Sequence, residues 1–171
     1  MSISILGAGN VGMALARAFV AKGESVRLGV PEPAKYHDAV AKLGPAASVG
    51  TTADAIATSD VIILAVPYGA AGSIARVVPD WKGRILVDAT NPLAPGLAGL
   101  TVGTTTSGAE EIAKAANGAR VVKAFNTTGA ENMEDARYSG GSVFMGGESS
   151  RRCDANPKSL VRQTLRKGRG R

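Results

Sequence analysis

Three glycines near the N-terminus, Gly7, Gly9 and Gly12, have the spacing G-x-G-x-x-G. An apolar strand pattern at residues 2–6 precedes them, and a helical pattern at 13–23 follows. In that order the first glycine permits a tight turn, the second lets the backbone approach a pyrophosphate, and the third brings the helix close to the strand. The helix N-terminus then offers free N–H groups to phosphate oxygens. The stretch predicts a dinucleotide site; the alternative is an ordinary glycine-rich turn.

The second predicted strand, residues 25–29, should end beside the adenosine ribose of such a dinucleotide. Proteins that prefer NAD usually place an acidic residue there, to bond the ribose hydroxyls. Here the tip carries Gly-Val-Pro at 29–31, with Glu32 close by and Lys35 a few residues on. The missing acid at the tip favours NADP over NAD. Lys35 is either a ligand for the 2′-phosphate or a solvated helix residue.

Further strands alternate with helices along the chain. The apolar run at 60–66, which ends at Pro67, is typical of a parallel strand buried on both faces. Other strands are predicted at 47–50, 84–88, 120–125 and 142–145, and helices at 34–43, 69–78, 110–118 and 129–136. This alternation predicts a single α/β domain over residues 1–147, with a doubly wound, mostly parallel sheet of the Rossmann type.

Two local signals refine the predicted elements. Ser107 and Glu110 have the spacing of a capping box at the start of a helix. The Pro- and Gly-rich segment 92–100 leaves the carboxyl end of the strand at 84–88, where open parallel sheets bind ligands. It is either a loop that shapes the pocket or a plain connection.

Charge divides the chain of 171 residues into two parts. The net charge of +6 comes entirely from residues 148–171, which hold eight Lys or Arg against two acids, so residues 1–147 carry 12 charges of each sign. A neutral body argues against a nucleic-acid-binding protein. The alternative is weak, salt-sensitive attachment of the basic tail to phosphates.

The chain lacks the sets of residues that several kinds of catalysis and metal binding need. With one histidine, His37, and one cysteine, Cys153, the chain offers no Ser-His-Asp set and no metal-ligand cluster, so we predict neither a catalytic residue nor a metal. Without a signal peptide or a long apolar span, we expect a cytoplasmic protein that does not enter a membrane.

Taken together, five segments resemble the NADPH-dependent coenzyme F420 reductases, also called F420H2:NADP oxidoreductases. The segments are GAGNVG at 7–12, LAVPYGA at 64–70, VDATNPL at 87–93, TTSGAE at 105–110 and VVKAFNTTGAENM at 121–133. The resemblance covers about residues 2–147. More distantly, the chain is similar to pyrroline-5-carboxylate reductases and to the cytosolic domain of the STEAP metalloreductases.

The resemblance implies an NADP-dependent oxidoreductase in which hydride passes between the nicotinamide and a second redox cofactor or small substrate, F420 in the family. Because the cofactors carry this reaction, it requires no acid–base residue. It also implies a homodimer. The cofactor-binding residues that it implies are Gly7, Ala8, Gly9, Asn10, Val11, Gly12, Lys35, Ala65, Val66, Pro67, Tyr68, Asn91, Pro92 and Ala130.

Two departures from the family pattern stand out. The family typically places Ser or Thr and then Arg after the second strand, where this chain has Val30 and Pro31, so the preference for NADP should be weakened or lost. Family members also continue into a C-terminal segment that helps to form the dimer and the deazaflavin pocket. Here residues 148–171 form a basic tail, which we expect to be flexible.

This tail suggests two alternatives. A frameshift near residue 148 would produce it; the coding DNA contradicts that hypothesis if no other frame restores a family-like continuation. Otherwise the chain is a genuine short member with a flexible basic tail. In either case, the chain is an oxidoreductase or, alternatively, an NAD(P)-binding module without turnover.

Overall fold

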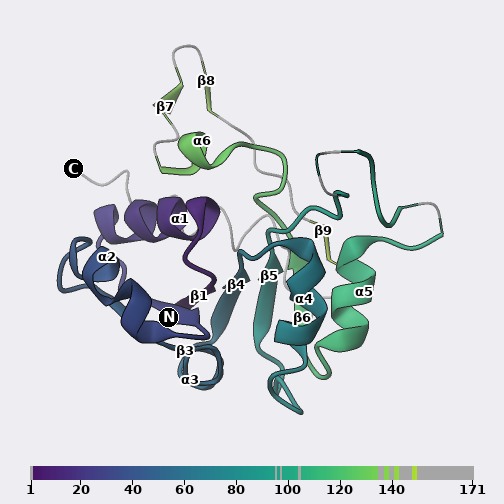
Figure 1. The fold of residues 1–171 in the computed structure, drawn as a ribbon, viewed down its shortest axis with the longest axis horizontal. Helices are drawn as coiled ribbons and strands as arrows, with labels where there is room; N and C mark the ends of the chain where they lie inside the picture. The colour runs from purple at the N-terminus through teal and green to yellow at the C-terminus, as the bar shows by residue number, and fades with distance from the viewer. Residues whose placement is uncertain are drawn as a thin grey trace.

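The computed structural model describes residues 2–94, 96, 98–103 and 105–134, together with the pairs 137–138, 141–142 and 148–149. Within these residues, six parallel strands form one sheet in the order β3-β2-β1-β4-β5-β6 (Figure 1). Their bounds are β1 Ile3–Leu6, β2 Val26–Val30, β3 Ala47–Thr51, β4 Val61–Leu64, β5 Ile85–Asp88 and β6 Arg120–Lys123. This is the strand order of doubly wound dinucleotide-binding sheets, and it confirms the predicted fold class.

Helices cover both faces of the sheet (Figure 1). One hydrophobic cluster contains residues of α1, α2 and α6, and a second contains residues of α3, α4 and α5. The bounds are α1 Asn10–Ala21, α2 His37–Ala41, α3 Thr52–Ala57, α4 Tyr68–Ala75, α5 Gly108–Ala115 and α6 Ala130–Glu134, with a 3-10 helix, η1, at Pro33–Tyr36. None of the helices in the described ranges is long and apolar enough to cross a membrane.

Strands β1 and β4 are buried along their whole length, as their apolar runs predict, whereas the edge strand β3 is partly exposed. Along β1, Ile5 belongs to the cluster beneath α1, whereas Leu6 belongs to the cluster beneath α3 and α4. Ser4 is a fully buried polar residue. Its hydroxyl donates to the Ala55 carbonyl at 2.9 Å and lies 2.6 Å from the Ser59 hydroxyl, so the strand carries this polar group without an unpaired donor.

Local signals set the ends of the helices. Gly23 has φ +80, and hydrogen bonds from Gly23 N–H to Val20 C=O and from Glu24 N–H to Phe19 C=O close α1. The capping box of Ser107 and Glu110 is present at the start of α5, as predicted. The indole of Trp81 is fully buried and donates to the Ala75 carbonyl at 2.8 Å, at the end of α4.

Some predicted boundaries differ from the structure. The strand predicted at 60–66 ends at Leu64, because Pro67 has no N–H for the ladder and precedes α4. The strand predicted at 120–125 ends at Lys123. The helix predicted at 34–43 divides into η1 and α2.

The C-terminal elements also differ from expectation. The strand predicted at 142–145 contributes only residue 142 to β8 (Gly141–Ser142), which pairs antiparallel with β7 (Arg137–Tyr138) outside the main sheet. Residues 143–145 lie outside the described part. Strand β9 (Glu148–Ser149) pairs with β6, and the rest of the predicted tail, 150–171, lies outside the described residues.

Candidate cofactor site at the carboxyl ends of the strands

The glycine loop after β1 is packed so closely that two of its glycines accept no side chain. Gly7 has φ +105, and a Cβ there would lie 2.4 Å from the Ala65 carbonyl oxygen. A Cβ on Gly12 would lie 2.1 Å from the Gly7 carbonyl oxygen. The Gly7 N–H donates to the Gly29 carbonyl at 2.9 Å, which ties the loop to the end of β2. The loop is thus held between β2 and the residue that follows β4.

Gly9 is different, because a side chain at this position would point into open space. Among the described residues, no heavy atom outside Gly9 and its two chain neighbours lies within 4 Å of the position that its Cβ would take. Gly9 precedes α1 in an extended conformation, and the first helical bond runs from Met13 N–H to Gly9 C=O. The N–H groups of residues 10–12 therefore come before the helical ladder. A glycine that packing does not require, at the N-terminus of a helix, fits the approach of a pyrophosphate.

A second helix N-terminus lies beside the first. Strands β1 and β4 are neighbours in parallel register, so the segment 65–68 leaves the same edge of the sheet as the glycine loop. Helix α4 begins at Tyr68, after Pro67. Because the helices that follow β1 and β4 lie on opposite faces of the sheet, this edge is the topological switch point, where such sheets bind ligands.

Tyr68 leans toward the next strand and helix. A Cβ on Gly108, the first residue of α5, would lie 3.0 Å from the Tyr68 ring and 3.5 Å from Pro92. Partial burial raises the pKa of the Tyr68 phenol, and the nearby carboxylates of Glu111 and Asp88 raise it further. At neutral pH the phenol is therefore protonated and able to donate a hydrogen bond.

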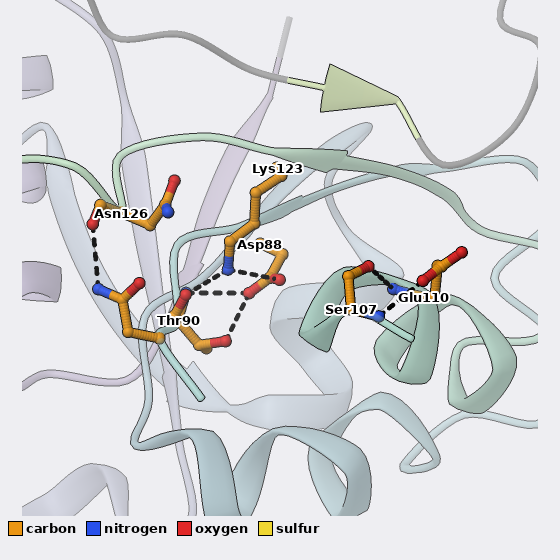
Figure 2. Close-up of polar contacts among 7 residues, drawn as sticks. Asp88, Thr90, Ser107, Glu110, Lys123 and Asn126 are labelled. Carbon is orange, nitrogen blue, oxygen red and sulfur yellow. Dashed lines mark hydrogen bonds and ion pairs between the residues drawn. The ribbon is translucent and has the colours of Figure 1, made fainter. Parts of the chain in front are cut away.

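A buried polar cluster lies at the ends of β5 and β6 (Figure 2). Asp88 is fully buried; its Oδ1 accepts hydrogen bonds from the Thr90 N–H at 2.9 Å and the Thr90 hydroxyl at 2.7 Å. Its Oδ2 lies 2.8 Å from Lys123 Nζ. Lys123 also donates to the Thr90 carbonyl. The cluster shapes the backbone as it leaves β5, immediately before Asn91.

The two segments that leave β5 and β6 are joined by a further bond. The Asn91 amide Nδ2 donates to the Asn126 carbonyl at 3.0 Å (Figure 2). Phe125, just before Asn126, has φ +66, a conformation that costs energy in a residue with a Cβ. This turn carries the chain from β6 toward Ala130, the first residue of α6.

The segment after β5 folds back on itself. Leu93 and Leu100 form an antiparallel bridge, and Thr101 N–H donates to the Pro92 carbonyl at 2.8 Å. Both leucine side chains are exposed, at 43% and 68%. The described part of this loop is therefore a narrow hairpin that begins at the candidate site, although whether it shapes the pocket remains a prediction.

Lys35 lies apart, on η1 beyond the end of β2. Its Nζ is 2.7 Å from Glu32 Oε1, and both side chains are 65% exposed. Lys35, for which the family resemblance implies a role at the 2′-phosphate, is therefore paired with an acid.

The structure places every residue of the predicted site in a segment that leaves the carboxyl edge of the sheet. Sequence reasoning did not identify the buried cluster of Asp88, Thr90 and Lys123, or the carbonyl of Asn126. A usable signal existed, because a charged residue follows an apolar run at the end of each of the strands at 85–88 and 120–123. Among the described residues, no three His, Cys, Asp or Glu side chains are grouped so as to hold a metal ion.

The family described as NADP oxidoreductase, coenzyme F420-dependent, matches residues 2–92. The F420-dependent NADP reductase of Methanothermobacter thermautotrophicus is 32% identical in an alignment of 148 positions that covers 78% of this chain and 64% of that relative. The chain thus spans less than two thirds of the length of this relative.

Two solved structures are similar over nearly the whole chain. The hypothetical protein SMa0349 from Sinorhizobium meliloti has a TM-score of 0.85 at 30% identity, covering 96% of this chain and 81% of the other. A proposed F420-dependent NADP-reductase from Arthrobacter sp. FB24 has a TM-score of 0.76 at 25% identity, covering 98% and 81%.

Proposed function

Since the chain belongs to the family of coenzyme F420-dependent NADP oxidoreductases, we propose that it is an NAD(P)-dependent oxidoreductase that uses a deazaflavin of the F420 class as its second redox partner. The relative from Methanothermobacter thermautotrophicus, an F420-dependent NADP reductase by name, supports this proposal. These similarities favour an oxidoreductase over a binding module without turnover.

One observation in the structure carries the proposal. Gly9 faces open space at the N-terminus of α1, between two glycines that packing requires. A side chain at position 9 would fill the space that a pyrophosphate needs, without disturbing the protein. This separation between glycines required for packing and a glycine left open is what a dinucleotide site calls for.

The residues of the edge then have distinct roles. We assign the loop residues Ala8 to Val11 to the pyrophosphate and Ala65 to Tyr68 to the wall beside it. Asn91, fixed by its bond to the Asn126 carbonyl, and Pro92 lie next along the edge, where the nicotinamide is expected. Ala130 closes the far side, and Lys35 stands at the ribose end.

Bound NADP(H) would supply hydride chemistry with its partner, which needs close stacking in a dry cleft and no acid–base group of the protein. The chain itself positions the ring. The Asp88–Lys123 cluster orders the backbone before Asn91. Tyr68 keeps its proton at neutral pH and has its ring beside Gly108 at the start of α5.

Fluorescence titration of the full chain with NADPH tests the proposal. Gly9→Ala should weaken binding by about tenfold or more, or roughly 1.4 kcal/mol, while leaving the unfolding transition unchanged. Gly72→Ala in α4 is the matched control, because its Cβ would meet only the flexible end of Arg76 at 3.3 Å. Equal affinity in both variants would contradict the assignment of the glycine loop.

The redox partner is tested separately, by following the oxidation of reduced F420 in the presence of NADP. Turnover confirms the proposed reaction. Tight NADPH binding without turnover would support the binding module instead. Sedimentation of the same sample tests the expected homodimer.

A further inference from the structure

Two prolines hold an acidic residue at the end of β2. Glu32 lies between Pro31 and Pro33 and is extended, with φ −125 and ψ 83. Pro33 disfavours the helical conformation at Glu32, and the ring of Pro31 restricts its own φ. The Glu32 carboxylate accepts a hydrogen bond from Lys35 Nζ at 2.7 Å. The backbone therefore presents one carboxylate and one ammonium group together at a defined place.

Packing explains why this pair, and not the strand tip, carries the charges. A Cβ on Gly29 would lie 2.7 Å from both Ala55 Cβ and Leu6 Cδ2, so only glycine fits there. Val30 is buried, with 2% exposure. The first exposed positions after the strand are Pro31 and Glu32. Glu32 and Lys35 are therefore the first charged side chains after the strand, and both are exposed.

This pair is also in the right part of the fold. The bond from Gly7 N–H to Gly29 C=O joins the glycine loop to the end of β2. Glu32 follows the last glycine of the motif, Gly12, by 20 residues, the usual separation of the ribose-binding acid. An ion pair in which both side chains are 65% exposed is weak, so Lys35 can exchange partners at little cost.

We propose that Glu32 and Lys35 together set the choice between NADP(H) and NAD(H), an inference that rests on the proposed function. The Glu32 carboxylate accepts hydrogen bonds from the ribose hydroxyls of NAD(H). Lys35 turns from Glu32 to the 2′-phosphate of NADP(H). Because the carboxylate repels that phosphate and competes for the lysine, the chain binds both dinucleotides, and Glu32 limits its preference for NADPH.

The test compares dissociation constants of NADPH and NADH for the full chain and three variants. Glu32→Gln should bind NADPH about fivefold more tightly and NADH more weakly, as expected for one charge removed a few ångströms from a phosphate. Lys35→Gln should weaken NADPH binding by about tenfold and leave NADH nearly unchanged. Glu24→Gln, at the amino end of β2, removes an equal charge far from the site and should change neither.

Salt separates this effect from a general loss of structure. The gain in NADPH affinity of Glu32→Gln should shrink at about 0.5 M NaCl, because the charges are exposed. A Glu32→Gln protein in which the ratio of the two dissociation constants equals that of the wild type overturns the inference but leaves the proposed function standing. If the wild type binds neither dinucleotide, the proposed function fails and the inference fails with it.

Discussion

Lys123 and Asp88 lie opposite each other at the ends of β6 and β5, as partners in the parallel register, with 2.8 Å between Nζ and Oδ2. The side-chain exposure is 0% for the aspartate and 19% for the lysine. Such a buried pair adds little to stability relative to apolar residues, but the loss of one partner strands a buried charge. The pair therefore acts mainly to fix the backbone that leaves both strands.

Removing Lys123 should be costly for that reason. We expect Lys123→Met to lower the free energy of unfolding by about 3–5 kcal/mol, measured by urea denaturation with Trp81 fluorescence as the signal. Lys114→Met is the control, since its pair with Glu111 is exposed and its loss should lower the free energy of unfolding far less. Similar losses in the two variants would show that the Asp88 carboxylate finds other partners.

Gly12 and Gly9 should respond in opposite ways to the same substitution. A Cβ on Gly12 would overlap the Gly7 carbonyl, so Gly12→Ala should reduce stability by several kcal/mol or prevent folding. Gly9→Ala has open space and an extended backbone, so its melting temperature should stay close to that of the wild type. Thermal unfolding followed by circular dichroism measures both. A fully stable Gly12→Ala protein would mean that α1 can move away from β1.

The capping box should make the free energy of unfolding depend on pH in the acidic range. Hydrogen bonds from the Ser107 N–H and hydroxyl, and from the Thr106 hydroxyl, lower the pKa of Glu110 below 4.5. A lowered folded-state pKa stabilises the fold above the unfolded value, and this contribution disappears as the pH falls through the folded value. Glu110→Gln should therefore lose less stability than the wild type on acidification below 4.5. Parallel pH curves would contradict this account.

Tyr68 should ionise at a higher pH than an ordinary tyrosine. Burial and the neighbouring carboxylates place the pKa of its phenol above 10.0. In an ultraviolet titration, Tyr68→Phe should remove a component that ionises above 10.0, with the folded state checked at each pH. The same variant keeps the ring against Gly108, so it should bind NADPH normally if only packing matters. Weaker binding would identify the hydroxyl as a donor to the ligand.

Much of the fold could be predicted because local chemistry and tertiary structure agree. The glycine motif between a strand and a helix, the apolar run at 61–64 and the Ser107 capping box each point to the observed element. Strand ends were less predictable. Phe125 continues an apolar run, yet it adopts φ +66. It lies between Ala124, whose N–H donates to the Asp88 carbonyl, and Asn126, whose carbonyl accepts from Asn91.

The parts of the site that escaped prediction depend on pairing between strands. Asp88 and Lys123 are 35 residues apart and become partners only through the register of β5 and β6. The Glu32–Lys35 pair is local in sequence. Its proposed role at the ribose end depends on the close packing around Gly29, which leaves no room for a side chain at that position. Sequence periodicity does not contain either kind of information.

The contact between α1 and α6 has a consequence for biosynthesis. Met133 of α6 is buried in the cluster that α1 covers, and Arg17 pairs with Glu134 at 3.2 Å across 117 positions. During synthesis on the ribosome, part of the apolar surface of α1 stays exposed until α6 has been made and packs against it. Completion of the domain is thus a late event of synthesis, and the emerging chain should need protection by chaperones until residue 134 has left the exit tunnel.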